Sequence, residues 1–253
     1  EIPIYRVCVY DTETKDFVTE DFLPAEGGFL NVPPGTYDMI IYSAGSSVTY
    51  VDDDYSRWHV YAGTNAEETA AGLLIPEPEH IFTALLEEVE IPIYSTSSSI
   101  REMNVKTSKV LETYSIQFTD VTDIERVETA EIRISSQVPG RYLWGERTKD
   151  LSGSVRFNPV VDKENGRIYA VFNTFGRNTY RQNKVLATLV VVDVNGRIHQ
   201  WTADITDWIE SFDNVRKEII IDNEIKVPDT TDGGGLNPDV DDWDDNEIYV
   251  PIS

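Results

Sequence analysis

The chain has 253 residues, of which 45 are acidic and 21 basic, giving a formal net charge of −24. Such an acidic surface repels nucleic acid and anionic membrane surfaces, so we expect neither as a partner. The apolar runs, such as residues 189–192, are far shorter than the ~20 residues that a membrane helix needs. The length allows one large domain or two modest ones.

Short segments with period-two or continuous apolar character follow one another along the chain, separated by turn residues. They predict strands at residues 4–10, 28–32, 37–42, 48–51, 58–61, 89–93, 103–109, 112–118, 130–136, 154–157, 167–172, 185–194, 198–202, 218–221 and 247–251. Many short strands at this spacing are typical of β-sandwiches and barrels. The sequence therefore predicts an all-β fold.

The residues between strands indicate where the chain reverses. Pro33-Pro34-Gly35 separates two apolar segments and predicts a tight turn, because proline fixes φ and glycine tolerates φ > 0. Asn165-Gly166 and Asn195-Gly196 each lie between apolar strands. Asn-Gly is the preferred pair of type I′ turns, so both sites predict β-hairpins.

Helix is scarce in the predicted fold. A capping-box pattern at residues 65–68 predicts one or two helical turns through Ala71. Asp207 is placed to begin a second short helix, directly after the hairpin at Asn195-Gly196. We expect both helices to lie in loops rather than in a core.

A polar, serine-rich stretch at residues 95–101 predicts a domain boundary. We expect an N-terminal β-sandwich over residues 1–100 and a C-terminal β-sandwich over residues 101–253, because each part holds about as many strands as one small sandwich needs. A single large sandwich is the alternative. The C-terminal domain ends in a glycine-rich linker, an acidic tract and a last strand at residues 247–251.

The sequence contains no catalytic motif. His59, His80 and His199 lie far apart, and there is no zinc-binding helix, nucleophile elbow, phosphate loop or dinucleotide fingerprint. The one cysteine, Cys8, lies in a predicted strand without a neighbouring base, so we interpret it as a buried strand residue. We predict that the protein is not an enzyme and uses no cofactor. A hydrolase assembled from scattered residues is the alternative.

Two acidic clusters and one aromatic loop are candidate binding sites. Asp52-Asp53-Asp54 and residues 239–245 offer oxygen ligands for calcium but lack EF-hand spacing, so solvated loop charge is the simpler interpretation. Trp58 and Trp201 lie in predicted strands and are expected in cores. Trp144 lies in the glycine-containing loop 139–145, and its ring is the best candidate for stacking on a sugar.

Several short motifs occur in an order that is found in one known family. They are Val7-x-Val9-Tyr10-Asp11, Gly27-Gly28, the segment 32–38 with Ile41-Tyr42, Gly140-Arg141-Tyr142, Leu151-Ser152-Gly153, and the segments 172–176, 205–209 and 233–251. In this order the motifs resemble those of Bacteroidales fimbrillin-like surface lipoproteins, which include fimbrial anchor and accessory proteins. The likeness spans nearly the whole chain.

The resemblance implies two tandem Greek-key β-sandwiches of transthyretin-like or immunoglobulin-like type. It implies a non-enzymatic protein of the cell outer membrane, anchored through a lipid on a cysteine upstream of residue 1. Its partners would be other fimbrial subunits or cell-surface proteins, bound by strand exchange during fimbria assembly or cell adhesion. The last predicted strand, with Ile248, Tyr249 and Val250, is the candidate exchange strand, and an ordinary edge strand is the alternative.

The residues themselves leave a second function open. A glycan-binding surface lipoprotein of a polysaccharide-uptake system would use loop aromatics, above all Trp144, instead of strand edges. The two hypotheses differ in which part of the chain should be essential.

Overall fold

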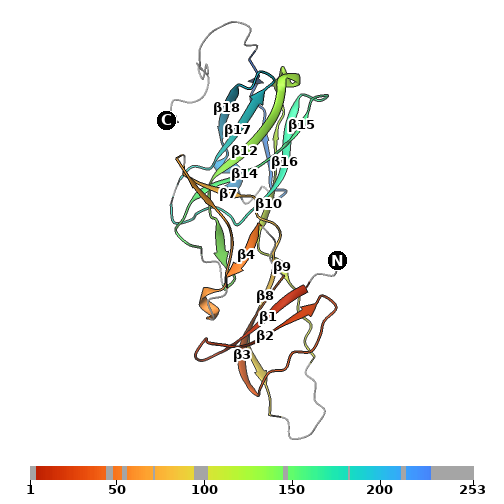
Figure 1. The fold of residues 1–253 in the computed structure, drawn as a ribbon, viewed down its shortest axis with the longest axis vertical. Helices are drawn as coiled ribbons and strands as arrows, with labels where there is room; N and C mark the ends of the chain where they lie inside the picture. Colours follow the sequence, from red (N-terminus) through yellow and green to blue (C-terminus); the bar gives the residue numbers. More distant parts are fainter. Residues whose placement is uncertain are drawn as a thin grey trace. The chain divides into compact units, whose positions relative to one another are not determined.

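The structure is a computed structural model that describes residues 4–43, 48–52, 56–70, 72–93, 102–144, 148–181, 183–211 and 215–228. Within these ranges the chain is mostly β, with several sheets, as the sequence predicts (Figure 1). No helix in the described part has the length and apolar character of a membrane span.

The first strands are β1 (Ile4–Asp11), β2 (Phe17–Pro24), β3 (Gly35–Ser43), β4 (Thr49–Asp52), β5 (Tyr61–Thr64), β6 (Glu67–Thr69), β7 (Gly72–Pro76), β8 (Phe82–Ile91), β9 (Ser108–Lys109) and β10 (Glu112–Phe118). They are followed by β11 (Val121–Thr122), β12 (Val127–Gln137), β13 (Gly140–Tyr142), β14 (Gly153–Phe157), β15 (Val160–Asp162), β16 (Arg167–Thr174), β17 (Leu186–Asp193), β18 (Ile198–Asp204), β19 (Glu218–Ile221) and β20 (Ile225–Lys226). The helical elements are η1 (Arg57–His59), η2 (Ile124–Arg126) and α1 (Thr206–Glu210).

These elements form two compact units that alternate along the chain. Unit 1 comprises the described residues of Glu1–Asn65, Pro78–Glu112 and Val138–Leu151, and unit 2 those of Ala66–Glu77, Thr113–Gln137 and Ser152–Ser253. A single cut after residue 100 differs from this division. Strand β7 pairs with β14 in parallel and strand β13 pairs with β5 in antiparallel fashion, so each joins a sheet made largely from the other half of the sequence.

In unit 1 the sheet β2-β1-β3-β8-β9 is antiparallel throughout. Val7 lies opposite Ile41, and Cys8 lies opposite Ile40. The first pair lies on one face of the sheet and the second pair on the other, and all four residues are buried. Because both faces are covered, the middle parts of β1 and β3 are nearly continuous apolar runs. Cys8 is buried in its strand, as predicted. The second sheet of this unit has the order β13-β5-β4.

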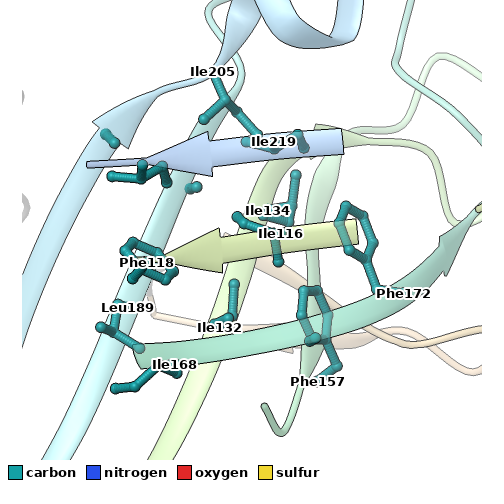
Figure 2. Packing of buried hydrophobic residues seen from close by; sticks show 14 of the residues in the cluster. Ile116, Phe118, Ile132, Ile134, Phe157, Ile168, Phe172, Leu189, Ile205 and Ile219 are labelled. Atoms are coloured by element: carbon teal, nitrogen blue, oxygen red, sulfur yellow. The ribbon is translucent and has the colours of Figure 1, made fainter. Parts of the chain in front are cut away.

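Unit 2 contains a sheet β15-β16-β10-β19, a sheet β18-β17-β12-β14-β7-β6 and the short pair β11-β20. Alternate residues of β10, β12, β16 and β17 are buried, as the period-two pattern predicts. Their apolar side chains form one cluster (Figure 2), which includes Ile116, Phe118, Ile132, Ile134, Ile168, Phe172, Leu189 and Ile219.

Aromatic stacking adds to this core. The rings of Phe157 and Phe172 stack with centroids 4.6 Å apart, and Tyr114 stacks on Phe172 at 5.7 Å. Strands β14, β16 and β10 are therefore held together by side chains that come from both larger sheets of unit 2.

Several predicted strands of unit 1 are wrong in position or length. Residues 28–32 form no strand, whereas β2 pairs with β1 without having been predicted. Strand β2 is an edge strand with polar residues on much of its length, so its apolar pattern is weak. Strand β8 is longer than predicted and β9 much shorter.

The predicted helix at residues 65–71 is also wrong. Strands β6 and β7 form an antiparallel hairpin there, with Glu67 opposite Leu74 and Thr69 opposite Gly72. Gly72 has φ of +106°. Pairing in the sheet therefore overrides the local helix signal. The second predicted helix is confirmed as α1, which begins one residue earlier than predicted, at Thr206.

Both Asn-Gly hairpins are present, but their turns are not of type I′. Only the glycines have positive φ, +62° at Gly166 and +75° at Gly196, whereas a type I′ turn needs it at both central residues. In the second turn the Asp193 carboxylate accepts hydrogen bonds from the backbone N–H groups of Asn195 and Arg197. This side chain organises a longer loop.

The stretch at residues 95–101, the glycine-rich linker and the last predicted strand lie outside the described residues.

Candidate functional site

Aromatic side chains gather in unit 1 where η1 precedes β5. Strand β13 pairs with β5, with Tyr142 opposite Tyr61, and Leu143 donates a backbone hydrogen bond to Val60 at 2.9 Å. This pairing brings the loop after β13, which carries Trp144, beside the short helix η1. Residues more than 80 positions apart in the sequence therefore share one site.

The site is a recess of about 250 Å³ lined by Trp58, His59, Tyr142 and Trp144, which we call the aromatic recess. The rings of Trp58 and Trp144 lie edge to face, with centroids 5.2 Å apart and planes at 87°. Trp58 is 42% exposed and Trp144 partly buried. Tyr142 packs edge to face on Tyr61 at 5.1 Å. The recess thus presents apolar ring surface next to polar edges.

A buried cation supports the two tryptophans. Arg57 is 2% exposed, and its guanidinium lies over the Trp58 ring at 5.2 Å and against the Trp144 ring. It forms ion pairs with Asp38 and, at 3.1 Å, with Glu87. Burial lowers the pKa of Arg57, while the Glu87 charge acts in the opposite direction. The guanidinium stays charged because arginine titrates far above neutral pH.

Asp38 of β3 fixes this cation. Its side chain is fully buried, and Oδ2 accepts a 2.9 Å hydrogen bond from Lys15 Nζ. Its Oδ1 accepts a 3.0 Å hydrogen bond from the backbone N–H of Glu88. A buried carboxylate with these partners is pre-organised to receive the Arg57 guanidinium. The two tryptophans of the aromatic recess are therefore backed by a buried network of ion pairs.

The histidines do not form a catalytic group. His59 lies in η1 and His80 in a loop, both exposed in unit 1, whereas His199 of unit 2 is 3.1 Å from Asp193 in a hairpin. Burial, and secondarily the charge of Lys109, lower the pKa of His80.

No group of three or more histidine, cysteine or acidic side chains in the described ranges could hold a metal ion. Asp52 ends β4, while Asp53, Asp54 and the acidic tract at residues 239–245 lie outside those ranges.

The outcome for the predicted tryptophans is mixed. Trp201 packs against the core of unit 2, as predicted. The prediction that Trp58 is a core strand residue is wrong, because it lies in η1 and is substantially exposed. Trp144 lies in the recess. The sequence did not reveal Arg57 or Asp38, although an aspartate within the apolar run of β3 is a signal for a buried ion pair. Ile248, Tyr249 and Val250 lie outside the described residues.

No protein-family profile matches the chain. In sequence it is 19% identical, over 98% of its length and 84% of the relative's, to a Bacteroides ovatus protein named, provisionally, fimbrium anchoring subunit Fim4B.

Solved structures are similar in fold. A Bacteroides ovatus protein provisionally described as an adhesin gives a TM-score of 0.68 at 18% identity, covering 89% of this chain and 86% of that one. The fimbrial anchor protein Mfa2 of Porphyromonas gingivalis gives 0.50 at 12% identity, covering 82% and 76%. A Bacteroides thetaiotaomicron protein, provisionally described as polysaccharide-binding, gives 0.55 at 11% identity, covering 89% and 82%. In sequence and in fold the chain is therefore similar to Bacteroidales fimbrial anchor and adhesin-like proteins, the resemblance that its motifs predict.

Proposed function

We propose that this protein is a non-enzymatic surface protein of the fimbrial anchor or adhesin type, which binds other fimbrial subunits during fimbria assembly or cell adhesion. The observation that carries the proposal is the alignment with the fimbrium anchoring subunit Fim4B over 98% of the chain. The order of the short motifs and the likeness in fold to the anchor protein Mfa2 point the same way.

In this proposal the two units are tandem Greek-key β-sandwiches. The single apolar cluster shared by the two large sheets of unit 2 supports this arrangement, since a sandwich buries the inner faces of two sheets against each other. A lipid on a cysteine upstream of residue 1 would hold the protein on the outer membrane.

Partner binding would use strand edges. Edge strands present unpaired backbone groups, which an added strand can satisfy. We propose the segment with Ile248, Tyr249 and Val250 as the exchange strand. A short run of β-branched and aromatic residues behind a glycine-rich stretch supports this role.

The test is a pull-down of the tagged full-length protein from its native cell surface, with mass spectrometry of the captured proteins. We expect other fimbrial subunits with the intact chain and none after deletion of residues 236–253. A Trp144→Ala variant serves as control and should capture the same subunits. If the deletion leaves capture unchanged, strand exchange through this segment is wrong. If the intact chain captures no fimbrial subunit, the assembly role itself is wrong.

The second candidate is a glycan-binding surface protein. The aromatic recess favours it, since exposed tryptophan rings can stack on sugars. A structural neighbour is provisionally described as polysaccharide-binding. A glycan array tests the candidate, with signals expected for the intact chain and for the deletion variant alike. An array without any bound glycan would refute this function.

A further inference from the structure

We infer that the aromatic recess binds a single uncharged sugar ring, with Arg57 as a positioning residue. This inference rests on the second proposed function, glycan binding, and assigns it a site and a ligand class. Trp58, His59, Tyr142 and Trp144 would form the walls.

Exposed ring surface is the first observation. Trp58 keeps 42% of its surface exposed beside Trp144, although a tryptophan of a folded domain is usually buried over most of its area. A sugar ring has an apolar C–H face that can cover an aromatic ring, and hydroxyl groups that can bind polar groups at the rim. The ring nitrogens of His59 and the Tyr142 hydroxyl are the kinds of polar group that fix a ligand's orientation.

The size of the recess sets the extent of the ligand. Pockets for drug-sized molecules measure roughly 300–1,000 Å³. The recess, at about 250 Å³, lies below this range. It therefore suits one ring of a glycan, with the rest of the chain in solvent.

Charge determines the ligand class. Two cations, Arg57 and Lys15, pair with two carboxylates, Asp38 and Glu87, so the ion-pair network that holds the tryptophans has no net charge. An anionic sugar would meet the repulsion of a chain with net charge −24. A quaternary ammonium ligand would seek the same tryptophan rings that the Arg57 guanidinium already contacts, and the two positive charges would repel each other. An uncharged ring avoids both penalties.

Arg57 acts through the tryptophans and not on the ligand. At 2% exposure it has almost no surface that a sugar could touch. Its planar guanidinium lies against Trp144 and over Trp58, and it forms an ion pair with Asp38. Lysine would preserve the charge but not the flat contact surface. Arg57 thus sets the relative orientation of the two rings.

The test uses the whole protein with 15N-labelled tryptophan and observes the indole N–H signals by NMR. The probes are the methyl glycosides of glucose, galactose, mannose and N-acetylglucosamine, each raised to about 50 mM, which detects Kd values on the order of 10 mM. Choline and glucuronate are the cationic and anionic probes. Trp58→Phe and Trp144→Phe assign the two recess signals.

We expect at least one methyl glycoside to shift the Trp58 and Trp144 signals and to leave that of Trp201 in place. Trp58→Ala should weaken binding about tenfold or more, while Trp208→Ala, which removes an exposed ring in unit 2, should not change it. Arg57→Lys should move both recess signals in the ligand-free protein and weaken binding, with the Trp201 signal unchanged.

The inference is overturned if none of the four glycosides shifts the recess signals, if Trp58→Ala binds as well as the unaltered protein, or if choline or glucuronate binds more tightly than every glycoside. Comparison with the glycan array separates two kinds of failure. If Trp58→Ala still binds glycans on the array, the glycan-binding function holds but its site lies outside the aromatic recess. If no glycan binds on the array and no glycoside shifts the recess signals, both the glycan-binding function and this inference are wrong.

Discussion

Replacing Asp38 with asparagine should strongly destabilise unit 1. The substitution keeps the shape of the side chain but removes the charge that Arg57 faces in a site where both residues are almost fully buried. Breaking a buried ion pair on one side costs about 3–5 kcal/mol, because the remaining charge is left desolvated and uncompensated. Glu87 pairs with the same guanidinium but is largely exposed, so its compensation is small.

Urea unfolding followed by tryptophan fluorescence measures this loss. With a denaturant slope of about 2 kcal/mol per M, the midpoint of the transition that involves unit 1 should fall by roughly 2 M. Lys15→Met is the matched control: Lys15 contacts the same carboxylate from a more exposed position and should cost under about 1 kcal/mol.

A double variant separates charge from packing. Adding Arg57→Met to Asp38→Asn removes the unpaired buried charge and keeps apolar volume, so it should recover most of the lost stability. The reasoning fails if Asp38→Asn alone costs under about 1 kcal/mol, or if the double variant is no more stable than the single one.

Three further predictions concern the hairpins and cores. Backbone N–H donors, chiefly that of Arg197, and the His199 ring lower the pKa of Asp193 from 3.8 to about 2, so its contribution to stability is present above pH 4 and is lost as the pH falls toward 2. Asp193→Asn should flatten that part of the acid unfolding curve, and an unchanged curve would contradict the assignment. Leu189→Ala should cost about 2–5 kcal/mol in chemical denaturation, against under about 0.5 kcal/mol for the exposed Val194→Ala. Gly140→Ala should destabilise unit 1 by about 1–3 kcal/mol and perturb the Trp144 indole signal, because the new Cβ would meet a backbone carbonyl oxygen of β5; a melting temperature within error of the unaltered protein would refute the close approach.

The strands of the core could be predicted from sequence because each depends on local alternation. In β16 and β17 every second residue is buried, and most of these buried residues are apolar; β12 shows the same alternation at Ile132 and Ile134. The Asn-Gly pairs mark reversals whatever the exact turn type. The likeness to a fimbrium anchoring subunit could likewise be predicted, since the order of short motifs is itself a property of the sequence.

The recess could be predicted only in part. Trp144 was a candidate because it lies in a loop with glycine and proline. Its partners Trp58 and Arg57 were hidden by an apolar segment that resembles a strand but forms the short helix η1. The hairpin of β6 and β7 was missed for a related reason, since its sequence favours a helix start and only pairing within the sheet makes it extended.

The sequence by itself determined the all-β character, the positions of most core strands and the likeness to fimbrial anchor proteins. Tertiary structure decided which strands pair across the chain: β7 joins β14 and β13 joins β5, so the units alternate where a single boundary was expected. It also decided that Asp38 forms an ion pair with Arg57, whose guanidinium contacts two tryptophan rings. Alternation and turn chemistry act over a few residues and can be read locally. Pairing between distant strands depends on the burial and hydrogen bonds that the whole fold offers, and no short segment encodes it.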